Sequence, residues 1–158
     1  MILSDFYTLS VAHSARCTHM KMAITIPIFN TRELPLVSSF LEEKLPTIFS
    51  SLCFNEDNLP FSEEVKATEV GHLFEHILLE HLCQNQLLNG CDCAVFSGRT
   101  YWNWKKEQEG IFHIVVDAGK EHSSIFEDAL EKTIHLTNDI FRLPLHVPTN
   151  PWLSQSRF

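Results

Sequence analysis

Two histidines and a glutamate lie within one short segment, His72-x-x-Glu75-His76. Residues three and four positions apart share one face of an α-helix, so these three side chains are expected to converge. Two imidazoles one turn apart can bind a single zinc ion, and a carboxylate beside them can act on water at that ion. The segment therefore predicts a Zn²⁺ site with His72 and His76 as ligands and Glu75 as general base. The alternative is a partly exposed helix face whose histidines make only local hydrogen bonds.

A catalytic zinc ion has three protein ligands, so one more ligand must come from elsewhere in the fold. Asp117 follows the expected strand Ile111–Val116, where a buried carboxylate is costly unless it is paired or coordinated. The competing interpretation is that Asp117 begins a turn, which is a common role for aspartate close to a glycine. Cys83, Cys91 and Cys93 are weaker candidates, because thiolates suit zinc but most buried thiols only fill apolar space.

Two further features could contact a substrate or a partner. Arg99 can bind a substrate carboxylate through two parallel hydrogen bonds, although an arginine in a turn also forms structural salt bridges. The segment Tyr101-Trp102-Asn103-Trp104 is rich in aromatic side chains. It can line a groove for a peptide or sugar, or form a contact between two copies of the chain. We favour the homo-oligomer contact, because aromatic residues are enriched at interfaces.

A long helix over residues 68–88 is expected to carry the three site residues. Thr68 is expected as its N-cap, and Asn89-Gly90 provides a stop signal. The side of the helix opposite the site is apolar and is expected to face the core; it comprises Val70, Leu73, Phe74, Ile77 and Leu78.

Strands and helices are expected to follow one another in the order ββααββα. The pattern predicts strands over 5–13, 22–29, 92–96 and 110–117, and helices over 35–51 (broken before Pro46), 68–88 and 123–141. Residues 54–64 read as a polar connection and 98–109 as a loop. Because strands and helices segregate, we expect a single α+β domain over 1–142, with a mostly antiparallel sheet packed against three helices. An extended tail is expected over 143–158.

Charge and composition narrow the classes of partner and the compartment. The 158 residues carry 12 Lys and Arg against 20 Asp and Glu, a net charge of −8, whereas nucleic acids and anionic membranes attract basic surfaces. No apolar run approaches the roughly 20 residues that span a bilayer. An acidic N-terminal segment and an odd number of cysteines, five, favour a reducing cytoplasm. We therefore expect neither a nucleic acid nor a membrane as partner.

Three motifs occur in an order that resembles the N-terminal domain of cyanophycin synthetases. They are Gly71-His-Leu-Phe-Glu-His-Ile-Leu-Leu-Glu80, Phe96-Ser-Gly-Arg-Thr100 with one extra residue, and Gly110-Ile-Phe-His-Ile-Val-Val-Asp117. The resemblance covers residues 20–140. It implies His72 and His76 as zinc ligands, Glu75 as general base, and Asp117 as third ligand where the family has glutamate. The His-x-x-Glu-His order is also that of inverted zincins, so a metallopeptidase-like half-fold is expected.

In that family the domain accompanies ATP-dependent ligase domains that build an Asp-Arg polymer, and in some members it resembles a metallopeptidase able to cut the polymer. The function expected here is zinc-dependent hydrolysis of amide or peptide bonds, with cyanophycin-like or isopeptide substrates. The partner is then a peptide or a small amide. The alternative is a non-catalytic binding or assembly module that retains the fold. A lyase or isomerase that uses the metal as a Lewis acid is a third interpretation.

Overall fold

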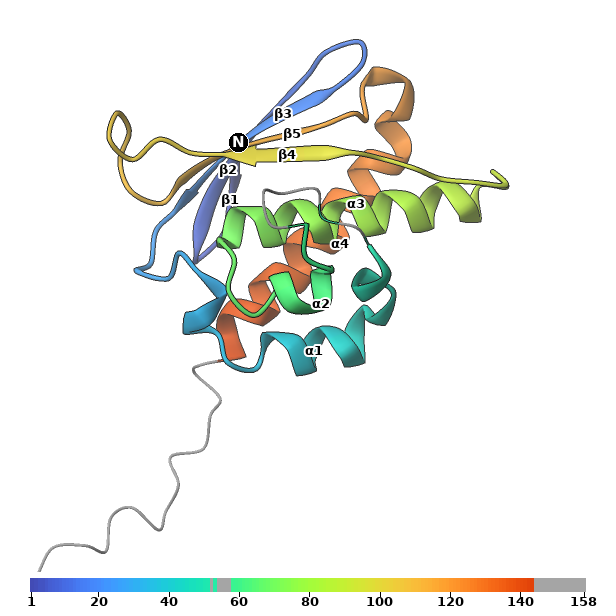
Figure 1. The fold of residues 1–158 in the computed structure, drawn as a ribbon. Coiled ribbons are helices and arrows are strands. Elements are labelled where there is room, and N and C mark those ends of the chain that lie inside the picture. Colours follow the sequence, from blue (N-terminus) through green and yellow to red (C-terminus); the bar gives the residue numbers. More distant parts are fainter. Residues whose placement is uncertain (52, 54–57, 144–158) are drawn as a thin grey trace, which may run out of the picture.

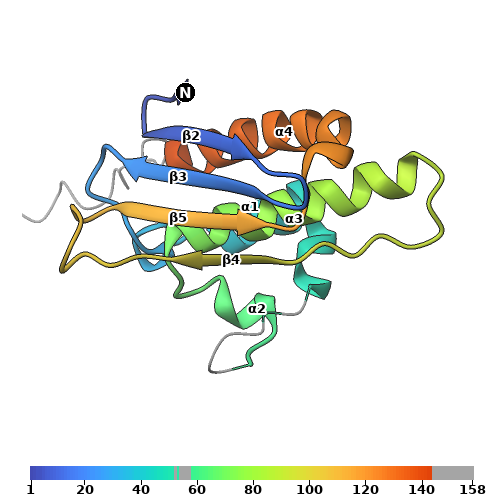
Figure 2. The ribbon, with the colours of Figure 1, turned by 90° about the horizontal axis from the view of Figure 1, so that it is seen from above.

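The computed structural model describes residues 1–51, 53 and 58–143. The expected tail over 143–158 lies outside this part, except for Leu143. Five strands form one sheet in the order β1-β2-β3-β5-β4, and every neighbouring pair is antiparallel (Figure 2). The strands are β1 (Ile2–Leu3), β2 (Tyr7–His13), β3 (Thr18–Ile24), β4 (Gly98–Tyr101) and β5 (Ile111–Val116).

The helices lie on one side of this sheet (Figure 1). They are α1 (Val37–Lys44), α2 (Phe61–Glu64), α3 (Val70–Leu88) and α4 (Ser123–Arg142). Short 3₁₀ helices occupy Thr31–Glu33, Pro46–Ser50 and Lys120–His122. The prediction of a single α+β domain with an antiparallel sheet is confirmed. The break expected before Pro46 is also present, because α1 ends at Lys44 and a 3₁₀ helix begins at Pro46.

Helix α3 packs directly on the sheet. Alternate residues of β5 point toward the helices and are fully buried, as the period of two in a strand requires: Phe112, Ile114 and Val116. At Gly71 a β-carbon would collide with the ring of Phe112. Glycine therefore allows the first turn of α3 to approach the sheet closely.

The strand predicted over 92–96 is wrong, and β4 instead covers Gly98–Tyr101, which was expected to be a loop. The pairing of β4 with β5 stops at Ser97, whose backbone N–H donates to Oδ1 of Asp117 at 2.7 Å. In a continuous antiparallel ladder this donor would bind a backbone carbonyl. A side chain has taken that place, so residues 92–96 have no ladder to extend.

Three other boundaries differ from the expected ones. A strand was expected over 22–29, but β3 runs from Thr18 to Ile24. It starts earlier because the hairpin with β2 pairs His13 with Thr18. β1 was not expected. α2 falls inside the expected polar connection, of which residues 54–57 lie outside the described part. No helix in the described ranges has the length and apolar character needed to cross a bilayer.

Candidate metal centre

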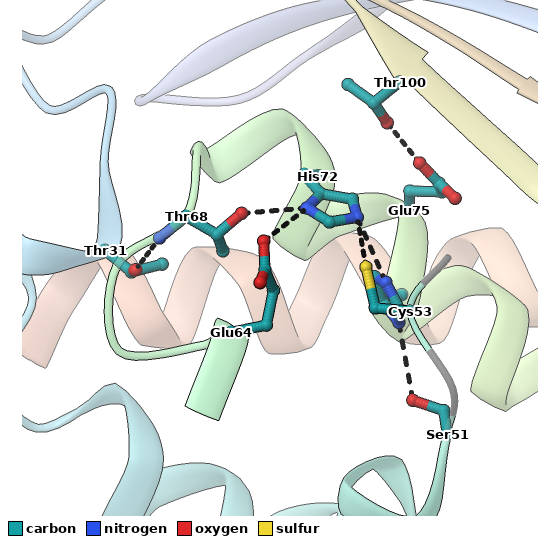
Figure 3. A network of polar contacts seen from close by, with 9 residues as sticks. Thr31, Ser51, Cys53, Glu64, Thr68, His72, Glu75 and Thr100 are labelled. Atoms are coloured by element: carbon teal, nitrogen blue, oxygen red, sulfur yellow. Dashed lines mark hydrogen bonds and ion pairs between the residues drawn. The ribbon is translucent and has the colours of Figure 1, made fainter. Parts of the chain in front are cut away.

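His72, which Figure 3 shows, and His76 lie one turn apart on α3, and their Nε2 atoms lie 3.1 Å from each other. Nδ1 of His72 lies 2.8 Å from the Thr68 hydroxyl, and Nδ1 of His76 lies 3.4 Å from the Ser51 hydroxyl. The Ser51 hydroxyl donates to the carbonyl of Ile48, so it is available to accept from Nδ1 of His76. With Nδ1 protonated on both rings, both Nε2 lone pairs point into the shared space, which is the arrangement that binds a cation.

Cys53 supplies a third donor to the same space. Its sulfur lies 3.5 Å from Nε2 of His72, and the ligand atoms of Cys53, His72 and His76 all lie within 4.8 Å of one another. Tetrahedral zinc, with bonds of about 2.1 Å to nitrogen and 2.3 Å to sulfur, separates two nitrogens by about 3.4 Å and nitrogen from sulfur by about 3.6 Å. The observed 3.1 and 3.5 Å are close to these values. Two of the three donor separations are therefore close to those of a tetrahedral zinc site, and the third is at most 4.8 Å.

Burial keeps both imidazoles neutral. Burial, with a smaller contribution from the neighbouring His72, lowers the pKa of His76 to about 3. Burial also lowers the pKa of His72, while the carboxylates of Glu64 and Glu69 act in the opposite direction. Glu64 Oε1 lies 3.9 Å from Nδ1 of His72. Neutral imidazole is the form that binds a metal.

Glu75 lies on the same helix, and only 4% of it is exposed. The Thr100 hydroxyl of β4 donates to its Oε2 at 2.5 Å. Burial raises the pKa of Glu75 to about 7, although the hydrogen bond from Thr100 lowers it. A β-carbon at Gly98 would lie 2.8 Å from Oε1, so glycine leaves room for this second oxygen. A carboxyl group with a pKa near neutrality suits proton transfer at neutral pH.

Thr68 does not cap α3 as expected. The N-cap is Glu69, whose side chain makes no capping hydrogen bond. The backbone N–H of Thr68 instead donates to the Thr31 hydroxyl at 2.9 Å, and its carbonyl accepts from the Thr31 N–H at 2.7 Å. These two bonds fix the residue that contacts Nδ1 of His72. Thr68 therefore orients the imidazole of His72, a candidate ligand, instead of capping α3.

Asp117 is not part of the group formed by Cys53, His72 and His76. It is exposed, and its two oxygens accept hydrogen bonds from the backbone N–H and the hydroxyl of Ser97, at 2.7 and 2.8 Å. Both bonds join Asp117 to a residue 20 positions away, so the turn interpretation stays a prediction. The role of Asp117 as third ligand also stays a prediction.

The sequence interpretation missed Cys53, because no helical or strand periodicity links it to a residue 19 positions further on. It considered three other cysteines, Cys83, Cys91 and Cys93, none of which belongs to the described group. Cys91 and Cys93 are exposed. Only the tertiary fold brings Cys53 to α3.

A cavity of about 400 Å³ opens beside these groups. Its lining includes Glu75, the three donors, Glu64, Glu69, and the strand residues Gly98, Arg99 and Thr100. Arg99 is exposed, and its guanidinium carbon lies 5.4 Å from the centre of the Tyr101 ring.

The aromatic segment after β4 divides into two parts. Tyr101 and Trp102 are 45% and 37% exposed, and Trp102 also lines the cavity. Trp104 is partly buried against the core and donates from Nε1 to the carbonyl of Ile111 at 3.0 Å. The surface available to a partner is therefore formed by Tyr101 and Trp102.

Fold and site together define an α+β domain with a candidate metal centre on its central helix. The sequence profile of the cyanophycin synthase-like N-terminal domain matches residues 19–142, and the chain belongs to this family. The matched region contains all of the candidate donors together with Glu75. A search of curated proteins returned no match.

Proposed function

We propose that this protein is a zinc-dependent hydrolase of amide or peptide bonds. His72, His76 and Cys53 would hold the ion, and Glu75 would act as general base. The observation that supports this most strongly is the meeting of three zinc-type donors and one buried carboxyl group at a single cavity. Zinc in such a site polarises a carbonyl group and acidifies water.

Glu75 is suited to move a proton from water to the leaving amine. Its Oε2 is occupied by the Thr100 hydroxyl, so Oε1 is the oxygen that exchanges the proton. The water oxygen bonds to the carbonyl carbon, the C–N bond breaks, and Glu75 delivers the proton to the amine nitrogen. A pKa of about 7 lets the same group accept and then release this proton at neutral pH.

Arg99 is an exposed residue of the cavity lining, and it would turn its guanidinium from the Tyr101 ring to contact an acidic group of the substrate. Because the chain belongs to the cyanophycin synthase-like family, Asp-Arg polymers and isopeptides are the first substrates to test. The proposed activity concerns the amide bonds of such compounds or of ordinary peptides.

The experiment combines elemental analysis of the purified protein with an assay of amide hydrolysis. We expect one zinc ion per chain in the wild type and in Glu75→Gln, because this substitution leaves the three donors in place. Hydrolysis should fall by about a hundredfold or more in Glu75→Gln, the range lost with a general base. A wild-type protein that binds no metal, or a fully active Glu75→Gln variant, contradicts the proposal and favours a binding or assembly module.

The third ligand can be tested separately with Cys53→Ser and Asp117→Asn. If Cys53 is the ligand, Cys53→Ser loses zinc and Asp117→Asn retains it. Replacement of zinc by cobalt should then give a thiolate-to-cobalt absorption band that disappears in Cys53→Ser. If instead Asp117→Asn loses zinc and Cys53→Ser retains it, Asp117 is the third ligand.

A further inference from the structure

Strand β4 forms one edge of the sheet (Figure 2). Its register with β5 runs from Gly98 opposite Val116 to Tyr101 opposite His113. Within the described ranges, no strand pairs with the other edge of β4. An unpaired edge presents backbone donors and acceptors that can bind another strand.

The hydrogen-bond pattern identifies which backbone groups point outward. The N–H of Asp117 donates to the carbonyl of Ser97 at 3.0 Å, so Ser97 directs its carbonyl toward β5. Residues of an antiparallel strand alternate between directing their N–H and C=O groups toward one neighbour and toward the other. Arg99 and Tyr101 therefore face β5, whereas the backbone N–H and C=O groups of Gly98 and Thr100 point away from the sheet.

These outward residues lie beside the candidate metal centre. Gly98 and Thr100 line the same cavity as Glu75, His72 and His76. The Thr100 hydroxyl contacts Glu75 directly, as Figure 3 shows. A peptide that added to this edge would run along the cavity and bring its own amide bonds to these side chains.

Charge indicates which kind of peptide fits. Glu64, Glu69 and Glu75 line the cavity, whereas the one basic residue in the lining, Arg99, has its guanidinium over the ring of Tyr101. A second copy of the chain would bring its own net charge of −8 and the same acidic lining, which disfavours pairing of two β4 edges. A peptide with basic side chains has the complementary charge.

We propose that the outer edge of β4 binds an extended peptide with basic side chains by strand addition, through the backbone groups of Gly98 and Thr100. The bound strand would be the substrate of the proposed hydrolase, so its role as a substrate rests on the proposed function. Binding itself requires neither zinc nor hydrolysis. Strand addition supplies affinity through the peptide backbone, and the acidic lining selects the side chains.

The test uses Glu75→Gln protein, so that the probe stays intact. The probe is an acetylated and amidated ten-residue peptide of alternating threonine and lysine; the control peptide replaces lysine with glutamate. Amide hydrogen exchange is followed residue by residue by NMR. At a concentration of about ten times Kd, exchange at Gly98 and Thr100 should slow by about tenfold. Exchange at Arg99 and Tyr101 should change little, because their N–H groups already bind β5.

Two variants test the role of charge. Glu69→Gln should weaken lysine-peptide binding by about threefold, the effect of one exposed ion pair. Glu42→Gln on α1 removes the same charge from an exposed position outside the cavity and should bind as tightly as the parent protein. The glutamate peptide should bind at least about tenfold more weakly than the lysine peptide.

Three results would overturn the inference. They are the absence of lysine-peptide binding, binding without protection of Gly98 and Thr100, and protection of these amides by protein concentration alone, which would indicate pairing between two copies. Peptide binding with protected amides but no hydrolysis by the wild type would support strand addition while contradicting the proposed function. Hydrolysis by the wild type without protection of these amides would support the proposed function and contradict strand addition.

Discussion

A buried hydrogen bond connects α3, which carries the candidate metal centre, to α4. His81 is 8% exposed, and its Nδ1 lies 3.1 Å from the Thr133 hydroxyl. That hydroxyl donates to the carbonyl of Ala129 at 2.7 Å, so it accepts from a protonated Nδ1 of His81. The structure thus uses the neutral imidazole with its proton on Nδ1. Acid should weaken this part of the fold.

The pKa of His81 determines how much folding stability is lost in acid. Burial, with a smaller contribution from Lys132, lowers it from 6.5 to about 4, while Asp128 acts in the opposite direction. The unfolded chain therefore binds a proton more readily than the folded protein. Stability from neutral His81 is complete above pH 6.5 and is lost as the pH falls through this window to about 4. A difference of about 2.5 pH units, at 1.36 kcal/mol each, corresponds to about 3 kcal/mol.

The assay is urea unfolding, followed by circular dichroism, of the wild type and His81→Asn. Asparagine can keep a donor near the Thr133 hydroxyl but does not titrate. The free energy of unfolding of the wild type should fall relative to that of the variant by about 3 kcal/mol between pH 7.5 and pH 4. His72 and His76 are present in both proteins, so their titration cancels in the difference. Parallel pH profiles for the two proteins would refute the assignment of His81 as a buried neutral group.

Three further predictions concern the site and its support. Gly71→Ala should lower the free energy of unfolding by about 1–3 kcal/mol in urea titrations, because the new β-carbon collides with Phe112; an unchanged value would show that the helix can move away freely. Thr100→Val removes the donor that lowers the pKa of Glu75, so the acidic limb of kcat/KM against pH should move upward by about one pH unit; an unmoved limb would contradict this role. Thr68→Val should weaken zinc binding about tenfold or more in competition with a chelator, because Nδ1 of His72 loses its hydrogen-bond partner. Equal zinc affinity of the variant and the wild type would contradict the orienting role of Thr68.

The parts of the fold that depend on local periodicity could be predicted from the sequence. The spacing of His72 and His76 placed both on one face of a helix, and the helix expected over 68–88 differs from α3 only at its first two residues. The break before Pro46 follows equally from a local cause, the missing backbone donor and the fixed backbone angle of proline.

The rest depended on contacts between distant segments. Cys53 reaches His72 because the chain turns back after the 3₁₀ helix Pro46–Ser50, and no local pattern marks that return. The edge strand was misplaced because the ladder from β5, and the hydrogen bonds between Ser97 and Asp117, determine where pairing stops. Residues 92–96 have a strand-like composition, yet no neighbour offers them a continuous set of backbone partners.

Strand β4 connects proton transfer to substrate placement. The side chain of Thr100 holds Oε2 of Glu75, while the backbone of the same residue points to the open edge where we propose that a peptide binds. A peptide that paired with Thr100 would also exclude water from Glu75, and further burial raises the pKa of a carboxyl group. Binding of an extended chain should therefore raise the pKa of Glu75, so the pH above which its carboxylate can accept a proton from water should move upward. The open edge of β4 would thus affect proton transfer by Glu75 as well as the placement of the peptide.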